Sequence, residues 1–258
     1  MRWQRRLRER VERAGFAAFY RLAALQYALG VATPKRTVAG RYWSYEPTNP
    51  HGDEPGLAAL DRLASDAVVY DVGAHVGEYA VALARDTDRQ VVAFEPNPTA
   101  ARRLERTVAR NGVGDRLRIH RIGLGEVDAL RPFYRSSFSK CSSLNSALAD
   151  RPGAAVDALE SIPVRRLDTI VDAGEPPPDG IKVDVEGGEL AVLAGGERTI
   201  RTYRPLLVVE PHGREREAAI REWLADRGYV AESAGDGLVA RPPESASGSV
   251  RGPDRRRS

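Results

Sequence analysis

The sequence predicts an α/β fold with a Rossmann-like, doubly wound and mostly parallel sheet that ends in a C-terminal antiparallel hairpin. Three observations lead to this expectation. From residue 68 onward, short apolar runs alternate with helical segments, which is typical of a parallel sheet covered on both faces. The first run leads into a glycine-containing turn, and several later runs end in an acidic residue. Polar groups at strand ends are expected where open α/β sheets bind ligands.

The apolar periodicity places each element of this sheet. We expect strands at residues 68–72, 91–95, 117–122, 181–185 and 206–210. We expect helices at residues 77–85, 98–111, 188–200 and 214–227, and a closing hairpin at 229–240. Residues 130–170 interrupt the alternation with a Ser-rich stretch, so we expect an insertion there that covers the substrate.

The two ends of the chain differ from the domain expected at residues 37–240. Apolar residues recur at helical spacing near the N-terminus, namely at Trp3, Leu7, Val11, Ala14, Ala18, Leu22, Leu25 and Leu29. Residues 1–36 are therefore expected to be a basic amphipathic helical segment, which either packs on the domain or lies on a membrane surface. Residues 241–258 are rich in Pro, Ser, Gly and Arg and are expected to be a disordered basic tail.

Charge and cysteine content narrow the function classes. Of the net charge of +3, residues 1–30 contribute +5 and residues 241–258 contribute +3, which leaves −5 for the body. A body of this charge does not favour nucleic acid as a partner. The one cysteine, Cys141, excludes an internal disulfide and fits the cytoplasm. The N-terminus lacks the pattern of a signal peptide, so we expect a cytoplasmic protein, with the inner membrane face as the alternative for the N-terminal helix. The sequence contains no signal for a particular oligomeric state.

The first expected strand ends in the sequence Asp-Val-Gly-Ala-His-Val-Gly, which starts at Asp71. Gly73 and Gly77 allow a tight turn and a close approach to a ligand, and the following helix offers free amides. The second strand ends at Glu95, twenty-two residues beyond Gly73. An acid at this strand tip can accept hydrogen bonds from the ribose hydroxyls of an adenosyl ligand.

The same turn distinguishes between two adenosyl ligands. A dinucleotide fingerprint needs glycine where this chain has His75, and glycine or alanine where it has Glu78, whose carboxylate would repel a pyrophosphate. Asp71 instead suits a ligand with a positive ammonium and sulfonium, so we expect S-adenosylmethionine. The expected cofactor-binding residues are Asp71, Gly73, Ala74, His75, Gly77, Glu95 and Pro96.

Candidate catalytic residues follow the last two parallel strands. Asp184 lies at the carboxyl end of the fourth strand, Glu186 follows in the next turn, and His212 follows the fifth strand. We expect Asp184 to act as the base, Glu186 to orient the acceptor and His212 to be the alternative base. No metal site is expected.

At this point the sequence resembles the FkbM-type methyltransferases of the class I S-adenosylmethionine-dependent group. The resemblance covers roughly residues 45–229 and rests on several motifs in order. These are residues 71–77, Phe94-Glu95-Pro96, Asn111, Ser142-Ser143-Leu144, Leu167-Asp168, residues 182–187 with Glu189 and Leu193, and Glu210-Pro211-His212. The resemblance implies S-adenosylmethionine as cofactor and O-methylation of a small molecule, a sugar, or a glycan or lipid-linked acceptor. The family pattern usually has Asn where this chain has His75.

Two other functions remain as alternatives. An RNA or DNA methyltransferase is the nearest enzymatic one, although the Asn/Asp-Pro-Pro-aromatic loop for amino-group methylation is absent and Cys141 lacks the Pro-Cys context of a cytosine-attacking nucleophile. A non-catalytic S-adenosylmethionine-binding partner protein would keep Gly73 and Glu95. It would not need three titratable residues on the acceptor side, which favours an enzyme.

Overall fold

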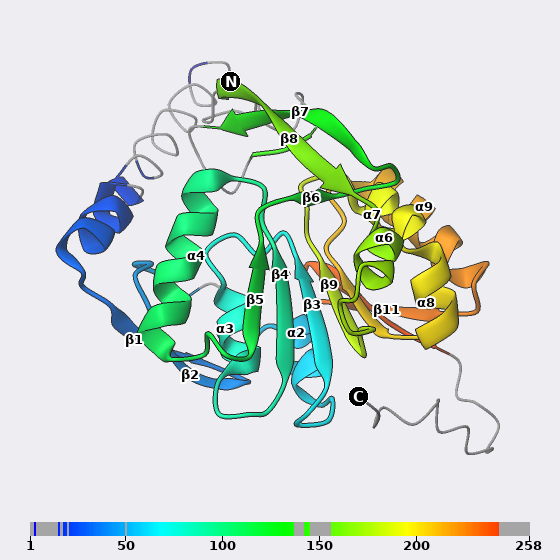
Figure 1. Ribbon diagram of the computed structural model, residues 1–258, viewed down its shortest axis with the longest axis horizontal. Helices are drawn as coiled ribbons and strands as arrows, with labels where there is room; N and C mark the ends of the chain where they lie inside the picture. Colours follow the sequence, from blue (N-terminus) through cyan, green and yellow to red (C-terminus); the bar gives the residue numbers. More distant parts are fainter. Residues whose placement is uncertain are drawn as a thin grey trace.

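A seven-stranded sheet forms the centre of the computed structural model, which describes residues 3, 15, 18–19, 21–49, 51–136, 142–144 and 156–242 (Figure 1). Its strands lie in the order β11-β12-β10-β9-β3-β4-β5. Their bounds are β3 (Val68–Val72), β4 (Gln90–Phe94), β5 (Leu117–His120), β9 (Gly180–Val183), β10 (Leu206–Val209), β11 (Val230–Ala234) and β12 (Gly237–Arg241). The strands from β10 to β5 are parallel, and the β11–β12 hairpin adds antiparallel to β10. The predicted fold class is confirmed.

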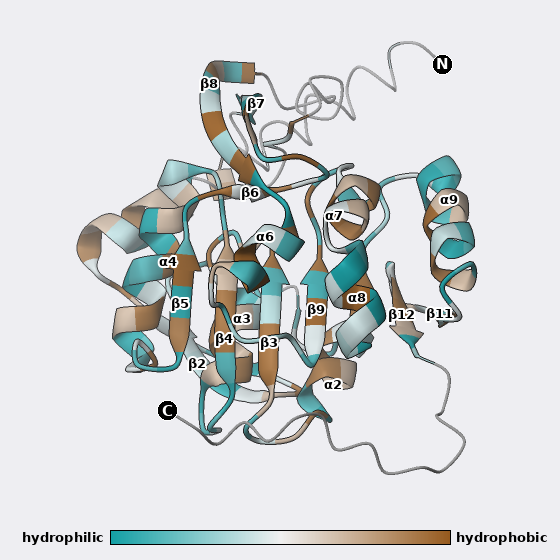
Figure 2. Ribbon diagram, turned by 45° about the vertical axis from the view of Figure 1, so that its right-hand side comes forward, coloured by the Kyte–Doolittle hydropathy of each residue, from teal (hydrophilic) through white to brown (hydrophobic). Residues whose placement is uncertain are grey.

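Helices cover both faces of this sheet, which gives the molecule two apolar cores (Figures 1 and 2). The first face is covered by α2 (Pro55–Asp61), α3 (Glu78–Ala84) and α4 (Pro98–Asn111). The second is covered by α6 (Leu167–Asp172), α7 (Glu189–Gly195), α8 (Glu197–Tyr203) and α9 (Arg214–Ala225). Because successive side chains of a strand point to opposite faces, Val69 joins the first core while Val68 and Tyr70 join the second. This double burial explains the continuous apolar runs of the sequence.

The predicted helix at 188–200 is wrong in one respect, because two helices occupy the segment. The break falls at Gly195 and Gly196, and Gly196 caps both helices. A Cβ atom on Gly195 would lie 1.9 Å from the carbonyl oxygen of Gly125, so the chain here packs directly on the backbone of another segment. The predicted helix at 98–111 is confirmed, with Asn97 as its N-cap.

The expected insertion forms a second sheet. Strands β6 (Gly123–Leu124), β8 (Val156–Arg165) and β7 (Ala129–Ser136) pair in this order, and the sheet lies across the carboxyl ends of the parallel strands (Figure 1). The alternation of exposed and buried residues in β8 was not visible to a search for continuous apolar runs. Cys141 lies outside the described residues.

A hairpin before the main sheet was not predicted. Strands β1 (Thr33–Thr37) and β2 (Gly40–Ser44) pair antiparallel, so β1 begins within the segment that we had assigned to the N-terminal helical region. Asn111 of α4 holds the hairpin with two hydrogen bonds of 2.7 Å, one from the amide of Trp43 and one to its carbonyl oxygen.

The helix at residues 21–29 contacts the domain through a face other than the predicted apolar stripe. Leu22, Leu25 and Leu29 of the predicted apolar stripe are exposed, whereas Ala23 and Tyr27 are buried. Within the described part of the chain, no helix has both the length and the apolarity that a membrane crossing requires. The predicted tail lies outside the described residues beyond Pro242.

Candidate active site

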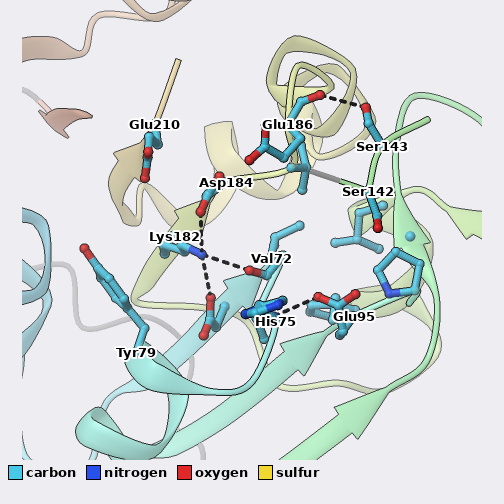
Figure 3. Close-up of a pocket in the computed structure, with 18 of the residues that line it drawn as sticks. Val72, His75, Tyr79, Glu95, Ser142, Ser143, Lys182, Asp184, Glu186 and Glu210 are labelled. Carbon is cyan, nitrogen blue, oxygen red and sulfur yellow. Dashed lines mark hydrogen bonds and ion pairs between the residues drawn. The ribbon is translucent and has the colours of Figure 1, made fainter. Parts of the chain in front are cut away.

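A cavity opens at the carboxyl ends of the parallel strands, where β3 and β9 lie side by side and the chain order of the strands reverses (Figure 3). This is the position at which open α/β sheets bind ligands. The cavity and its open mouth together span about 1060 Å³ of space free of protein atoms, part of which is open to solvent. Its walls come from the β3–α3 turn, the ends of β4, β9 and β10, and the second sheet through Leu124 and Phe133.

The two glycines of the β3–α3 turn are required by contacts within the protein. Gly73 has φ of +81°, and a Cβ atom there would lie 1.8 Å from the carbonyl oxygen of Asp184. Gly77 has φ of +89°, and its Cβ atom would lie 2.2 Å from a methyl group of Leu104. The turn is thus fitted tightly between β9 and α4, which explains why both positions need glycine.

His75 occupies this turn in the left-handed region, with φ of 50°. Asn and His are among the residues that adopt this region more readily than others, which accounts for a histidine at a position where the family usually has asparagine. The backbone amide of His75 donates a hydrogen bond of 2.7 Å to Glu95 Oε2 (Figure 3). The backbone role of this position is therefore independent of the side chain.

Glu95 follows β4 and is buried against the cavity. Its second oxygen accepts a hydrogen bond of 2.7 Å from the amide of Asn97, so two amides hold the carboxyl group in place. Burial raises the pKa of Glu95 to about 7 in spite of these two bonds. Each oxygen keeps a second lone pair for a ligand hydroxyl. Ala74 and Pro96 line the cavity beside it.

Asp71 is 1% exposed, and its two oxygens have partners within the protein. Oδ2 accepts a hydrogen bond of 3.0 Å from the amide of Ala80 in the first turn of α3, and Oδ1 lies 3.3 Å from Lys182 Nζ. Asp71, which the sequence analysis expects to contact a cationic ligand, lines the cavity and already pairs with a cation of the protein. Burial raises the pKa of the Asp71 carboxyl, and Lys182 opposes this.

Lys182 is the central cation of the site, and the sequence analysis did not single it out. It lies in β9, and its ammonium donates a hydrogen bond of 3.0 Å to the Gly73 carbonyl oxygen while contacting Asp71 and Asp184 (Figure 3). Burial alone would lower the pKa of Lys182, but Asp71, Asp184 and Glu210 together raise it above its ordinary value. A permanent positive charge therefore ties the tips of β3 and β9 together.

Asp184 comes directly after β9, as predicted, and faces the cavity. Burial raises the pKa of its carboxyl, but Lys182 at 3.4 Å and His212 at 3.8 Å outweigh this and hold the pKa below its usual value. Asp184 is therefore a stable carboxylate and a weak proton acceptor.

His212 is held between carboxyl groups. Its Nδ1 lies 3.0 Å from Glu189 Oε1, and its Nε2 lies 3.2 Å from Glu186 Oε2. Burial would lower the pKa of the imidazole, but the hydrogen bonds to these two glutamates raise it to about 10. His212 therefore carries its proton at neutral pH and cannot accept another, which argues against it as the alternative base.

Glu186 lines the cavity from a strained turn. Its φ of 53° lies in the left-handed region, and its carbonyl oxygen accepts a hydrogen bond of 2.8 Å from Ser143 Oγ of the insertion. The side chain points toward His212 and the cavity wall. The turn that carries Glu186 is thus fixed both by its own side chain and by the second sheet.

Glu210 is the titratable residue that the sequence analysis left unassigned. It follows β10 and lines the cavity, and its amide donates to the Val183 carbonyl oxygen at 2.9 Å. Burial and the nearby Asp184 carboxylate raise the pKa of Glu210 to about 7. Its place after a parallel strand, next to His212 in the sequence, was a signal that could have identified it.

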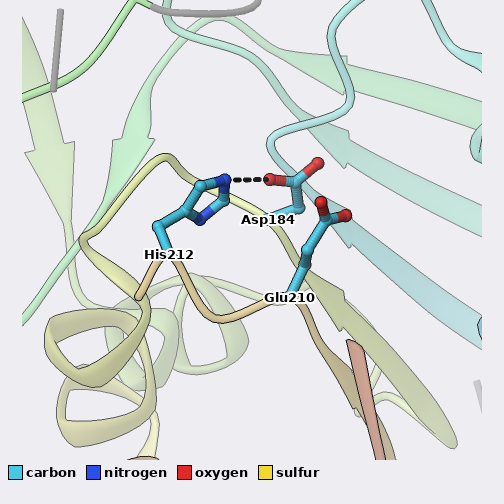
Figure 4. A group of neighbouring side chains, drawn as sticks. All are labelled: Asp184, Glu210 and His212. Atoms are coloured by element: carbon cyan, nitrogen blue, oxygen red, sulfur yellow. Dashed lines mark ion pairs between the residues drawn. The ribbon is translucent and has the colours of Figure 1, made fainter. Parts of the chain in front are cut away.

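Asp184, Glu210 and His212 could in principle hold a metal ion, since one potential ligand atom from each lies within 4.8 Å of the others (Figure 4). Their charges are already matched within the protein, because Lys182 neutralises Asp184 and His212 is protonated between Glu186 and Glu189. A metal ion would have to displace a proton and an ammonium, so the donor set favours the cations already present.

Two further motifs of the resemblance have structural roles. Asn111 fixes the β1–β2 hairpin, as described above. Asp168 is buried at the start of α6 and accepts a hydrogen bond of 2.8 Å from the amide of Thr199 in α8. Neither lines the cavity.

Comparison with known proteins identifies the family. Residues 71–231 match the methyltransferase FkbM domain, which is more than half of the chain. The chain belongs to the FkbM methyltransferase family. S-adenosylmethionine is therefore the cofactor of this protein.

Curated relatives match parts of this chain. The chain is 32% identical over 156 residues to the hexuronic acid methyltransferase AglP of Haloferax volcanii, covering 59% of each protein. It is 27% identical over 216 residues to the AMB antimetabolite synthetase AmbE of Pseudomonas aeruginosa, covering 69% of this chain and 10% of AmbE. The chain thus spans only part of the length of both curated relatives.

A solved structure supports the fold. The methyltransferase FkbM from Methylobacillus flagellatus KT superposes with a TM-score of 0.55 at 20% identity, covering 73% of this chain and 48% of that one.

The residues around the cavity fit this cofactor. Glu95 presents a buried carboxyl group to the cavity, and Gly73 and Ala74 of the β3–α3 turn line the cavity as well. Six carboxyl groups line the cavity, which suits a ligand with two positive charges. They are Asp71, Glu78, Glu95, Asp184, Glu186 and Glu210.

Proposed function

We propose that this protein transfers the methyl group of S-adenosylmethionine to a neutral hydroxyl oxygen, most simply of a sugar or glycan. The observation that carries this proposal is Glu210, a cavity carboxyl group whose pKa is raised to about 7 and which can therefore accept a proton near neutral pH. Bound S-adenosylmethionine supplies an electrophilic methyl group.

The charge of the cavity favours a neutral acceptor. The described residues that line it include six carboxyl groups, no arginine and two cations, and both cations are already paired within the protein. The Lys182 ammonium is shared by Asp71 and Asp184, and His51, whose pKa is raised to about 9, is paired with Glu54 and Glu78. An anionic acceptor would therefore meet repulsion from the carboxylates without an unpaired cation to offset it. A hydroxyl group, by contrast, can donate a hydrogen bond to any of them.

We assign the roles on the acceptor side from the pKa values. Glu210 receives the proton that the acceptor hydroxyl loses as its oxygen bonds to the methyl carbon. Asp184, a stable carboxylate, accepts a hydrogen bond from the acceptor and raises the pKa of Glu210 by its charge. Glu186 orients the acceptor, as the sequence suggested. We therefore propose Glu210 as the base in place of Asp184, which the sequence analysis expects in this role.

On the cofactor side, Glu95 would hold the ribose hydroxyls, and the turn with Gly73, Ala74 and His75 would lie under the cofactor. Asp71 acts indirectly, by fixing Lys182 and α3. Most of the rate acceleration is expected from holding the acceptor oxygen in line with the methyl group, since the sulfur leaving group is neutral.

The relative AglP supports a sugar acceptor, because it is a hexuronic acid methyltransferase. A hexuronic acid carries both hydroxyl groups and a carboxyl group, so its methylation can give an ether or an ester. The acidic cavity of the present protein favours the ether.

The test uses S-adenosylmethionine with a labelled methyl group and two matched acceptors, a methyl hexopyranoside and the corresponding methyl hexuronoside. Labelled extracts, split into glycan, lipid, protein, nucleic-acid and small-molecule fractions, serve as a wider acceptor source. We expect label in a carbohydrate product that resists mild alkali, since ethers survive it and esters release methanol. Label that alkali releases, or label confined to nucleic acid or protein, would contradict the proposal. Binding of the cofactor without any transfer would favour the non-catalytic alternative.

A further inference from the structure

The helix at residues 21–29 presents two different faces. It lies beside α4, and Tyr27 is its contact to the domain (Figure 1). The Tyr27 ring packs against the Tyr45 ring in a tilted arrangement with the centroids 4.9 Å apart, and the Arg103 guanidinium lies 4.6 Å from the Tyr27 centroid. This face is buried and holds the helix to the domain.

The opposite face is apolar and exposed. Leu22, Leu25 and Leu29 are 50%, 53% and 66% exposed. At about 100° per residue, these leucines centre about 150° around the helix from Ala23 and Tyr27. A row of leucines that points away from the domain is not explained by packing against the residues that the structure describes.

The composition of the N-terminal sequence indicates what covers this row. Residues 1–30 carry seven arginines and two glutamates, and of the arginines Arg21 is described, exposed and on the same helix as the leucines. Trp3 is 65% exposed. An exposed leucine face in a segment that also carries tryptophan and a strong positive charge is typical of helices that lie in the headgroup region of anionic bilayers.

We propose that the leucine face of residues 22–29 binds the surface of an anionic lipid membrane, with the helix lying in the plane of the bilayer. The domain remains attached to the helix through Tyr27. The helix face that carries Tyr27 is directed away from the lipid. This binding is independent of the methyl transfer proposed above and would place the cavity next to acceptors held at a membrane.

The experiment is sedimentation of the full chain with vesicles of phosphatidylcholine alone or mixed with phosphatidylglycerol. Each half-exposed leucine that leaves water contributes about a fivefold factor to partitioning. The triple variant Leu22→Gln, Leu25→Gln, Leu29→Gln is therefore expected to bind the anionic vesicles about 100-fold more weakly. The double variant Ala24→Gln, Ala28→Gln changes exposed residues of the same helix outside the leucine row and is expected to bind like the unchanged protein.

We expect binding to require phosphatidylglycerol and to weaken with salt. Failure of the unchanged protein to sediment with anionic vesicles would overturn the proposal, as would equal binding by both variants. A second overturning result is a dimer, detected by light scattering, that the triple variant abolishes in the absence of vesicle binding, since the leucine face would then contact a second copy. Thermal melting of each variant checks that the domain stays folded.

Discussion

Glu210→Gln tests the proton acceptor most directly. The substitution keeps the shape of the side chain and removes its basicity, so an effect on turnover reports proton transfer. A positioned general base contributes about 10²–10⁴-fold to a rate, which sets the expected loss of kcat at pH 8. The affinity for S-adenosylmethionine should change little, because we propose that Glu95 rather than Glu210 holds the ribose hydroxyls of the cofactor.

The pH dependence gives the quantitative part of this test. With a pKa of about 7, Glu210 in the free enzyme is ionised at pH 8, whereas about 1% is ionised at pH 5. The kcat/KM of the unchanged enzyme for the acceptor, measured at saturating S-adenosylmethionine, should therefore rise with pH around a midpoint near 7. The variant should lack this rise, so the ratio of the two enzymes falls from at least about 100 at pH 8 toward a few at pH 5.

Asp184→Asn gives a different signature, which makes the two roles separable. The Asp184 carboxylate raises the pKa of Glu210, so its neutralisation should move the midpoint to lower pH while the rise itself persists. Glu215→Gln, an exposed position on α9, serves as control and should change neither quantity. The assay measures the initial rate of label transfer to the acceptor that the fractionation experiment under "Proposed function" identifies. Near-normal turnover in Glu210→Gln, or loss of the pH-dependent rise only in Asp184→Asn, would return the role of base to Asp184.

Three further predictions follow from the charges of the site. Glu95→Ala should weaken S-adenosylmethionine binding about 10- to 100-fold in calorimetry, because a hydrogen bond to a charged group contributes about 1.5–3 kcal/mol; unchanged affinity together with NADH binding would refute the cofactor assignment. Exhaustive treatment with a metal chelator should leave turnover unchanged, since Lys182 and His212 supply the positive charge beside Asp184; activity restored by an added divalent ion would show that a metal is required. The pKa of His212 is raised from 6.5 to about 10, so its ion pairs stabilise the fold fully below about pH 6.5, and this stability is lost as pH rises through 10; the melting temperature should fall over that window, and His212→Gln should melt lower at pH 6 with a flatter decline.

The sheet could be predicted from the sequence because its burial is two-sided. Val68–Val72 and Leu206–Val209 are almost entirely apolar, and a strand covered on both faces needs such a run. The β1–β2 hairpin could not be found in this way. It carries Lys35 and Arg36 beside Tyr42 and Trp43, and only its contacts with α3 and α4 bury one side of it. Cytoplasmic location and the disordered tail stay predictions.

Part of the site was equally visible. A strand followed by glycine and an acid after the next strand are local signals, and the structure places Glu95 and the turn of Gly73 on one cavity. The structure also brings together the three candidate catalytic residues. His212 Nε2 lies 3.8 Å from Asp184 Oδ1 and 3.2 Å from Glu186 Oε2. Their protonation states were not visible, because each depends on partners from other elements. His212 in isolation has a pKa near neutrality, and only the contacts with Glu186 and Glu189 turn it into a fixed cation.

Lys182 shows why the site needed the fold to be understood. A lysine in a buried strand reads as an interruption of the apolar pattern, and the sequence offers no indication of which carboxylates it meets. In the sheet, β9 lies next to β3, so Lys182 contacts Asp71 on one side and Asp184 on its own strand end. The sequence analysis expects Asp71 to bind the cofactor and Asp184 to act on the acceptor, whereas in the structure both carboxyl groups contact the Lys182 ammonium. The carboxyl group left with a pKa near 7 on the acceptor side is Glu210, and a base is expected where a charge is not already matched.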